Sequence, residues 1–241
     1  MKHLNIYKNE NFNSKSLTSY KNESFNIKPL ATYITEYIIK KKLDKPIDSE
    51  DHYKYFPETR EKLIFYIKML LDKGETNFNC IDTSKITDMG RLFSEIKDSG
   101  YDINNIEISL WDVSNVENFG TMFFNCKDFN CDISEWNVSS MKRSSNMFYG
   151  CTNFNCDLSN WNVSNLQVAD NMFLDCENLN CDLSNWDTKN LRIADKMFQG
   201  CKNMTCDLSK WNVTGLYKYT VRDMFKYCKR KFIPNWYRKI K

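Results

Sequence analysis

Tryptophan recurs in this chain at a fixed interval of 25 residues. All six tryptophans belong to the series: Trp111, Trp136, Trp161, Trp186, Trp211 and Trp236. A fixed period in this range is typical of a repeat array, in which one short unit stacks on copies of itself. The spacing therefore predicts a stack of like units, each burying its apolar side against its neighbours.

The units align without gaps from Trp111 to Trp211, and the second of them reads WNVSSMKRSSNMFYGCTNFNCDLSN. A degenerate first copy begins at Ile81 and is five residues longer, and the last copy has two extra residues before Met224. Within a unit, FNCDIS alternates apolar and polar residues, which predicts a short strand. After each tryptophan, an Asx-Val-Ser turn is expected, followed by one short helical turn that ends in Met-Phe and Cys.

The pattern FNxDISxWxVSxVxxxxxMFxxC resembles the BspA-like leucine-rich-repeat family, also described as a domain of unknown function in mycoplasmas. Similar units occur in tryptophan-repeat proteins of insect poxviruses. The resemblance covers residues 81 to about 228 and implies a solenoid with a recognition role and no catalytic residues. We therefore expect a leucine-rich-repeat-like repeat solenoid of short parallel strands and short helical turns in 25-residue units, with an N-terminal α-helical cap.

Composition and periodicity divide the chain into four expected parts. They are a disordered polar N-terminus (1–28), a two-helix N-terminal cap (29–75), the repeat solenoid (76–216) and the last repeat with a basic C-terminal cap (217–241). The two cap helices are predicted over 29–43 and 58–74, where apolar residues follow a helical period. Terminal units of a repeat array must differ from internal ones, because an open end exposes core.

The net charge of +3 hides an asymmetry between the array and the tail. Residues 76–216 carry 11 Lys/Arg against 19 Asp/Glu, whereas residues 217–241 carry 9 against 1. No apolar stretch near the N-terminus has the length of a signal peptide, and LIFYIKMLL is too short to cross a membrane. We therefore expect a protein without a membrane span, located in the cytoplasm (the host-cell cytoplasm if the protein is viral).

Cysteine follows the same period in four C-x4-C pairs. The first members are Cys126, Cys151, Cys176 and Cys201, and the second members are Cys131, Cys156, Cys181 and Cys206. Zinc ligation and disulfides are two interpretations of such pairs. We favour a third, a structural ladder of buried thiols beside the tryptophans, because the unit before Trp111 has Ile106 where the others have cysteine. No metal or cofactor is expected.

An acidic residue also recurs once in every unit: Glu107, Asp132, Asp157, Asp182 and Asp207. Like charges on adjacent strands repel, so each carboxylate is expected to accept hydrogen bonds from the backbone or from Asn and Ser side chains. Calcium bound between the carboxylates is the alternative, although the Gly-rich unit of calcium-binding β-rolls is missing.

Two surfaces are candidate binding sites. The units differ most after the Val/Met/Leu position, and a partner that is not periodic would contact residues that vary, which predicts a protein-binding edge at Lys142, Arg143, Gln167, Arg192 and Lys196. An ordinary solvated edge is the alternative. The basic tail interleaves cations and aromatics, as phosphate- and base-binding segments do, and its candidates are Lys229, Arg230, Lys231, Trp236, Arg238 and Lys239. The same tail equally suits a C-terminal cap.

Enzymatic motifs are missing from the sequence. It has no phosphate-binding glycine loop and no histidine in the array beside a Cys or Ser nucleophile, so we predict that the protein is not an enzyme. The leading hypothesis is a non-enzymatic protein–protein interaction module, a viral protein with a repeat scaffold that acts on a host protein. The alternative is a nucleic-acid or anionic-surface binder that uses the basic aromatic C-terminal segment, although we do not expect nucleic acid as the partner. The sequence leaves the partner and the oligomeric state open.

Overall fold

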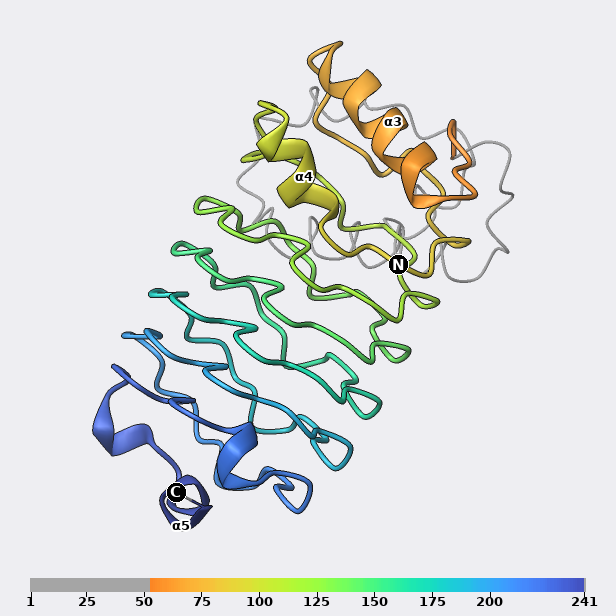
Figure 1. Cartoon of the computed structure of the whole chain (residues 1–241). Coiled ribbons are helices and arrows are strands. Elements are labelled where there is room, and N and C mark those ends of the chain that lie inside the picture. Colours follow the sequence, from red (N-terminus) through yellow and green to blue (C-terminus); the bar gives the residue numbers. More distant parts are fainter. Residues whose placement is uncertain (1–52, 241) are drawn as a thin grey trace, which may run out of the picture. The chain divides into compact units, whose positions relative to one another are not determined.

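Each 25-residue unit forms one coil, and the coils stack in chain order (Figure 1). This computed structural model describes residues 53–240. The segment expected to be disordered (1–28) and the first predicted cap helix (29–43) lie outside the described residues. Buried apolar side chains of successive coils form one continuous core along the stack.

Two helices lie at the N-terminal end of the described stack, α3 (Arg60–Leu71) and α4 (Leu92–Asp98). Helix α3 lies within the range predicted from the sequence, 58–74. The Thr59 side chain caps it by accepting a hydrogen bond from the backbone N–H of Lys62. The chain then leaves through Gly74, whose positive φ of 76° suits a residue without a side chain.

The Met-Phe segment becomes an α-helix only in the first copy, where it forms α4. That copy has five extra residues, which extend the segment into a helix before the chain returns to the next coil. In the later units the segment is a run of turns, because two residues four positions apart have positive φ, as Asn146 (57°) and Gly150 (71°) do. A left-handed residue interrupts an α-helical run, so the helical turn predicted for each unit does not form there.

Neighbouring coils are joined by backbone hydrogen bonds in this turn segment. The N–H groups of Ser144, Asn146, Phe148 and Gly150 donate to carbonyls 24 residues further on, at 2.8 to 2.9 Å. Isolated parallel bridges connect the same face, from Asn118 through Arg143 and Val168 to Ile193. The pairing is therefore parallel, but it is made of single bridges, and no extended strand forms over residues 53–240.

The segment FNCDIS, where the alternation predicts a strand, lacks this backbone ladder. Its side chains do alternate, since Phe129 and Ile133 are buried and Asp132 is exposed. Side chains instead take the backbone N–H groups: Asn155 donates to the Asn130 amide oxygen at 2.9 Å. Backbone pairing at this position does occur between the first coils, where Asn77 and Glu107 form a parallel bridge. In the later units the predicted strand does not form, because alternation reports which side chains are buried and not which groups bond.

The tryptophans run through the core as a second ladder. Each indole N–H donates to a carbonyl of the preceding coil, at 2.8 to 3.1 Å, over the whole series: Trp111, Trp136, Trp161, Trp186, Trp211 and Trp236. Phenylalanines stack beside them, with Phe148 and Phe173 separated by 5.6 Å between ring centroids. A buried indole needs a hydrogen-bond partner, and the stacked coil below supplies it.

The C-terminal end of the stack carries three short elements: η3 (Lys218–Thr220), η4 (Arg230–Phe232) and α5 (Asn235–Ile240). Tyr237 of α5 packs against Phe225 of the last coil with ring centroids 5.0 Å apart. Across residues 53–240, no helix has the length and apolar character that spanning a membrane requires.

Candidate interaction surfaces

The first cysteines of the pairs lie in the core. The Cys176 thiol donates to the Phe148 carbonyl at 2.9 Å, and Cys151 and Cys201 make the equivalent bonds one coil before and after. Cys126 is 2% exposed, and burial raises its pKa to about 12. All ten cysteines are free thiols. The thiols of Cys151, Cys176 and Cys201 bond within the stack and are not available to a ligand.

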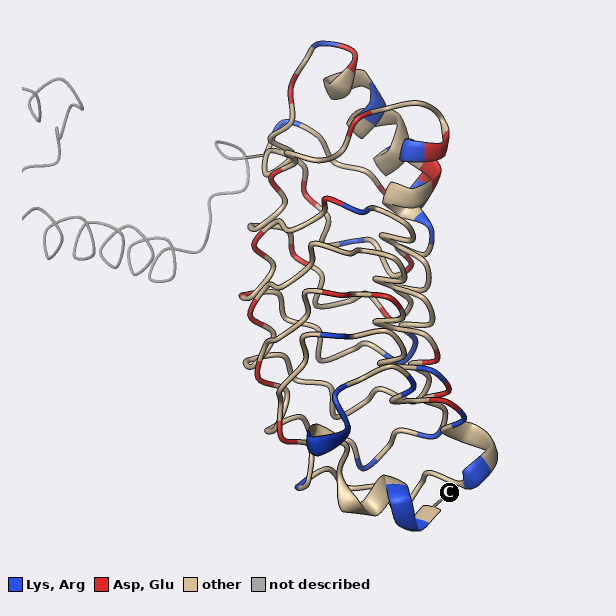
Figure 2. Cartoon of the chain, turned by 90° about the vertical axis from the view of Figure 1, so that its left-hand side faces the viewer, with Lys and Arg blue, Asp and Glu red and all other residues tan. Residues whose placement is uncertain are grey.

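Acidic residues recur along one side of the stack (Figure 2), and the series Glu107, Asp132, Asp157, Asp182 and Asp207 supplies one per unit. Each aspartate of the series accepts the backbone N–H two residues further on, as Asp132 does from Ser134 at 3.0 Å. That hydrogen bond is the main reason why the pKa of Asp132 lies below its usual range. The expected repulsion is thus offset within each coil. No group of three or more metal-ligating side chains suited to an ion occurs in the part of the chain that is described.

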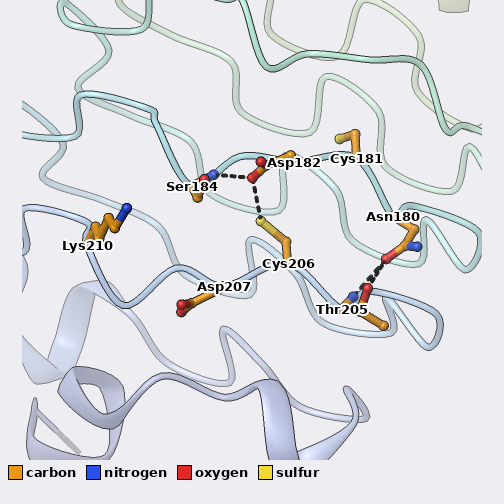
Figure 3. A pocket seen from close by; sticks show the side chains of 8 residues that line it. All are labelled: Asn180, Cys181, Asp182, Ser184, Thr205, Cys206, Asp207 and Lys210. Atoms are coloured by element: carbon orange, nitrogen blue, oxygen red, sulfur yellow. Dashed lines mark hydrogen bonds between the residues drawn. The ribbon is translucent and has the colours of Figure 1, made fainter.

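A shallow polar hollow of about 340 Å³ opens on this acidic side, between the last two full units (Figure 3). Its lining is Asn180, Cys181, Asp182, Ser184, Thr205, Cys206, Asp207 and Lys210. Burial raises the pKa of Cys181 to about 12 and that of Cys206 to about 11, so both thiols stay protonated at neutral pH. Because the thiolate is the nucleophilic form, the hollow holds no activated cysteine.

Asparagines that recur in several units also bond within the stack. The Asn178 amide donates to Asn153 at 3.3 Å, and Asn203 donates to Asn178 at 3.1 Å. The asparagines that follow three of the tryptophans, Asn137, Asn162 and Asn212, accept the N–H two residues further on. The polar side chains that repeat in every unit therefore hold the coils in shape.

The predicted protein-binding edge lies along the turn segments that carry the ladder. Lys142, Arg143, Gln167 and Arg192 are exposed, and Lys196 is half-buried at a left-handed position, with φ of 52°. Lys142, Gln167 and Arg192 occupy equivalent positions of successive coils, so the structure aligns them in one row. Lys196 lies four residues further along its coil and is not part of that row.

Two residues of this row have partners within the protein. Lys142 forms an ion pair with Glu117 of the preceding coil at 2.7 Å, and both side chains are about half-exposed. Arg192 donates to the Lys189 carbonyl at 2.9 Å, and its guanidinium lies against Gly215. Gln167 lies between them. With Glu117 at the equivalent position of the preceding coil, the side chains of successive coils change from acidic to basic to neutral to basic while the backbone beneath them repeats.

In the basic tail the cationic side chains are exposed, whereas the aromatic side chains make contacts within the protein. Exposed side chains are those of Lys229, Arg230, Lys231, Arg238 and Lys239. Trp236 donates its indole N–H to the Leu208 carbonyl at 2.8 Å and so belongs to the tryptophan ladder. Phe232 is half-buried beneath the Lys231 ammonium. Both aromatics are partly buried by contacts within the protein.

A feature absent from the sequence-based candidates lies beside the row. We call it the tyrosine knuckle, residues 217–220, which contains η3 and the two residues inserted in the last unit. Tyr217 is 65% exposed and Tyr219 is 80% exposed. The insertion itself was the available signal, because extra residues in one unit of an array form a protruding loop.

Comparison with known proteins gives one match. The model of the family described as "Mycoplasma protein of unknown function, DUF285" matches residues 66–177 and 142–236, and the two overlapping segments cover more than half of the chain. No curated protein and no solved structure matches.

Proposed function

We propose that this chain, which belongs to the Mycoplasma-type family of unknown function DUF285, is a non-enzymatic protein–protein interaction module. Its working part is the exposed row at the turn segments, at Lys142, Gln167 and Arg192, together with Arg143. The core and the acidic side serve the scaffold.

One observation carries this proposal: the repeated polar side chains have hydrogen-bond partners within the stack, whereas the varying Arg143 and Gln167 are exposed and their side chains make no hydrogen bond or ion pair with the described residues. Asp182 and Asn178, which recur in register, have partners within the stack. Gln167 and Arg143 vary between units and project from a hydrogen-bonded backbone. A partner protein without a period needs a surface of this second kind.

The scaffold favours binding because it is ordered in advance. The backbone of each edge segment is fixed by hydrogen bonds to the coils on both sides, as in Val168, which is bridged to Arg143 and to Ile193. Ordering loops and side chains at an interface costs affinity, and a surface that is already fixed reduces that cost.

The proposal includes the finer assignment that the resemblance implies. The stack is a leucine-rich-repeat-like solenoid of the BspA-like type, related to tryptophan-repeat proteins of insect poxviruses, and it acts on a host protein in the cytoplasm. The 25-residue period and the parallel bridges between coils support the solenoid class. The viral origin is supported by the sequence resemblance alone.

Site-specific photo-crosslinking tests the proposed surface. A photoreactive amino acid replaces Gln167 on the row or, as the matched control, Asn160, which is exposed elsewhere on its coil. We expect a discrete crosslinked protein in cell extract with the probe at Gln167 and none at Asn160. Equal labelling from both positions, or none from either, would contradict the proposal.

A second candidate function is binding of nucleic acid or an anionic surface by the tail. The observation in its favour is charge: over residues 217–240, the only ion pair is that of Arg222 with Asp195, at 3.3 Å. If the tail binds phosphate, binding of an oligonucleotide should weaken steeply as the salt concentration rises. Removal of residues 229–241 should then abolish that salt-sensitive binding. Binding of the protein partner at the row should survive that removal.

A further inference from the structure

We propose that the tyrosine knuckle docks an acidic segment of the partner protein. This inference rests on the proposed function, because it assigns one end of the same interaction surface. It starts from four exposed apolar or aromatic side chains in the last two coils: Ile193, Tyr217, Tyr219 and Tyr227.

The inserted residues are not needed to stack the last coil. Between the coils without insertions the ladder joins residues 24 positions apart, as in the bond from Ala169 to Ile193. In the last coil Ala194 bonds to Thr220, 26 positions on, at the same distance of 2.8 Å. The ladder thus skips the insertion, and the extra residues contribute exposed surface.

The knuckle is nevertheless closed by three hydrogen bonds between Tyr217 and Thr220. The Tyr217 backbone N–H donates to the Thr220 hydroxyl at 3.0 Å, and that hydroxyl donates back to the Tyr217 carbonyl at 3.0 Å. The Thr220 N–H closes the turn on the same carbonyl at 2.8 Å. A fixed turn that presents Tyr219 to solvent provides a large contact at low ordering cost, which is how tyrosine acts in many interfaces.

Charge identifies the partner as acidic. Lys218 lies within the knuckle, and Arg192 of the preceding coil lies against Gly215, just before it. Arg222 follows the knuckle and is paired with Asp195, which is 17% exposed. Residues 217–240 carry eight Lys/Arg and one acidic residue, Asp223. A basic segment would be repelled from this end, whereas carboxylates beside an aromatic or aliphatic anchor would complement it.

The knuckle also continues the proposed edge. Tyr217 follows Leu216 as Arg192 follows Leu191, so in sequence register it takes the place of Lys142, Gln167 and Arg192 in the next coil, while its backbone N–H bonds to Thr220 within the knuckle. The row therefore ends in two tyrosines, and a bound chain lying along the row would reach them. This continuity distinguishes the knuckle from the exposed Phe65 on α3, at the other end of the stack.

Peptide binding tests the assignment. Fluorescent peptides of negative, zero and positive net charge, with equal aromatic content, are titrated with the full chain at physiological salt. We expect the acidic peptides to bind most tightly. The double substitution Tyr217→Ala and Tyr219→Ala should weaken that binding by about tenfold or more, a loss typical of aromatic hot spots. Phe65→Ala, the matched control, should leave it unchanged.

Three outcomes would overturn the proposal. The first is that the protein prefers neutral or basic peptides, or binds none of the peptides. The second is that binding of the acidic peptides survives the double substitution. The third is that the protein binds oligothymidylate more tightly than the acidic peptides and needs the same tyrosines to do so. Circular dichroism of the double variant should match the intact protein, because the ladder bypasses both side chains. Crosslinking at Gln167 is independent of these results, so the knuckle can fail while the proposed function stands.

Discussion

At the scale of single residues, each tryptophan combines apolar burial with one specific hydrogen bond. Trp161 is 3% exposed and stacks on Trp186 with ring centroids 6.5 Å apart, and its indole N–H reaches the Ile133 carbonyl at 3.0 Å. That carbonyl is 28 residues earlier in the chain. The side chain therefore contributes area to the core and also fixes how one coil sits on the one before.

Replacing Trp161 with alanine should lower the free energy of unfolding by about 3–5 kcal/mol, as for other large aromatics removed from a core. Trp161→Phe retains a ring but removes one of the two donors to the Ile133 carbonyl, which keeps its hydrogen bond from the Trp136 N–H at 3.2 Å, so we expect a cost of about 0.5–1.5 kcal/mol. Urea denaturation of both variants measures the difference. A cost below about 1 kcal/mol for Trp161→Ala would mean that the indole does not support the core.

The buried thiols predict a loss of stability at alkaline pH. Burial raises the pKa of Cys126 from 9.0 to about 12, so the folded protein keeps a proton that the unfolded chain releases above pH 9. The thiol's contribution is complete below pH 9 and is lost as the pH rises toward 12, because ionisation then favours the unfolded state. The slope should be on the order of 1 kcal/mol per pH unit from this thiol.

Denaturant midpoints at rising pH in reducing buffer check the thiol prediction. The matched variant is Cys126→Ser, whose hydroxyl does not titrate in this range and can still donate to the Phe124 carbonyl, as the thiol does. The variant should show a shallower fall in stability above pH 9. Parallel slopes for the two proteins would contradict burial of this thiol.

At the scale of the elements, the turn segment depends on residues that tolerate positive φ. Gly150 has φ of 71°, and a Cβ placed there would meet the Asn125 side chain of the preceding coil. Gly74 has nearly the same φ, 76°, but open space around it. Substitutions at the two glycines therefore distinguish the cost of backbone strain, which both share, from the cost of a steric conflict between coils, which occurs only at Gly150.

Gly74→Ala should cost about 1–2 kcal/mol, the strain of a left-handed alanine. Gly150→Ala should cost a further 1–3 kcal/mol or so, because the new methyl must displace Asn125. Thermal or urea unfolding of the two variants gives the comparison. Equal costs would show that the coils can move apart at this point, against the close packing observed.

The same elements explain what the sequence could predict and what it could not. Burial of Trp161 and Cys151 follows from periodicity, and helix α3 follows from its spacing and cap. The backbone pairing does not, because an alternating segment has the same pattern whether carbonyls or side chains accept its N–H groups. The left-handed turns were also hidden, since one such position holds Asn146 in one unit and Lys196 in another, and lysine does not indicate positive φ.

The candidate surfaces were predictable to different degrees for a related reason. Variation between units identified Lys142, Gln167 and Arg192, and equivalence in register is enough to place them in one row. Variation between units does not reveal that the Trp236 indole donates to the Leu208 carbonyl, because the sequence of the tail is the same whether or not that hydrogen bond forms. Nor does it show that Tyr219 protrudes, which depends on the ladder skipping the insertion.

At the scale of the described stack, the acidic side and the basic C-terminal end are chemically distinct (Figure 2). Residues 229–240 close the end of the core, since Trp236 extends the indole ladder and Tyr237 covers Phe225, itself 4% exposed. The same segment also supplies much of the positive charge at the C-terminal end of the stack. Stability and electrostatic attraction at this end are therefore carried by different side chains of one segment.

Removing residues 229–241 should lower the free energy of unfolding by about 3–5 kcal/mol, the cost of withdrawing large aromatics from a core. The truncated protein should also self-associate, because an uncapped array exposes apolar surface. The control is the double substitution Lys229→Glu and Lys239→Glu, which keeps Trp236 and Tyr237 and alters only exposed charges, so its stability should change by less than about 0.5 kcal/mol. Urea denaturation and sedimentation velocity separate the two effects. If the truncated chain stayed monomeric and as stable as the intact one, the tail would be an appended basic segment, and the last coil would have to end the core with Phe225 in contact with water.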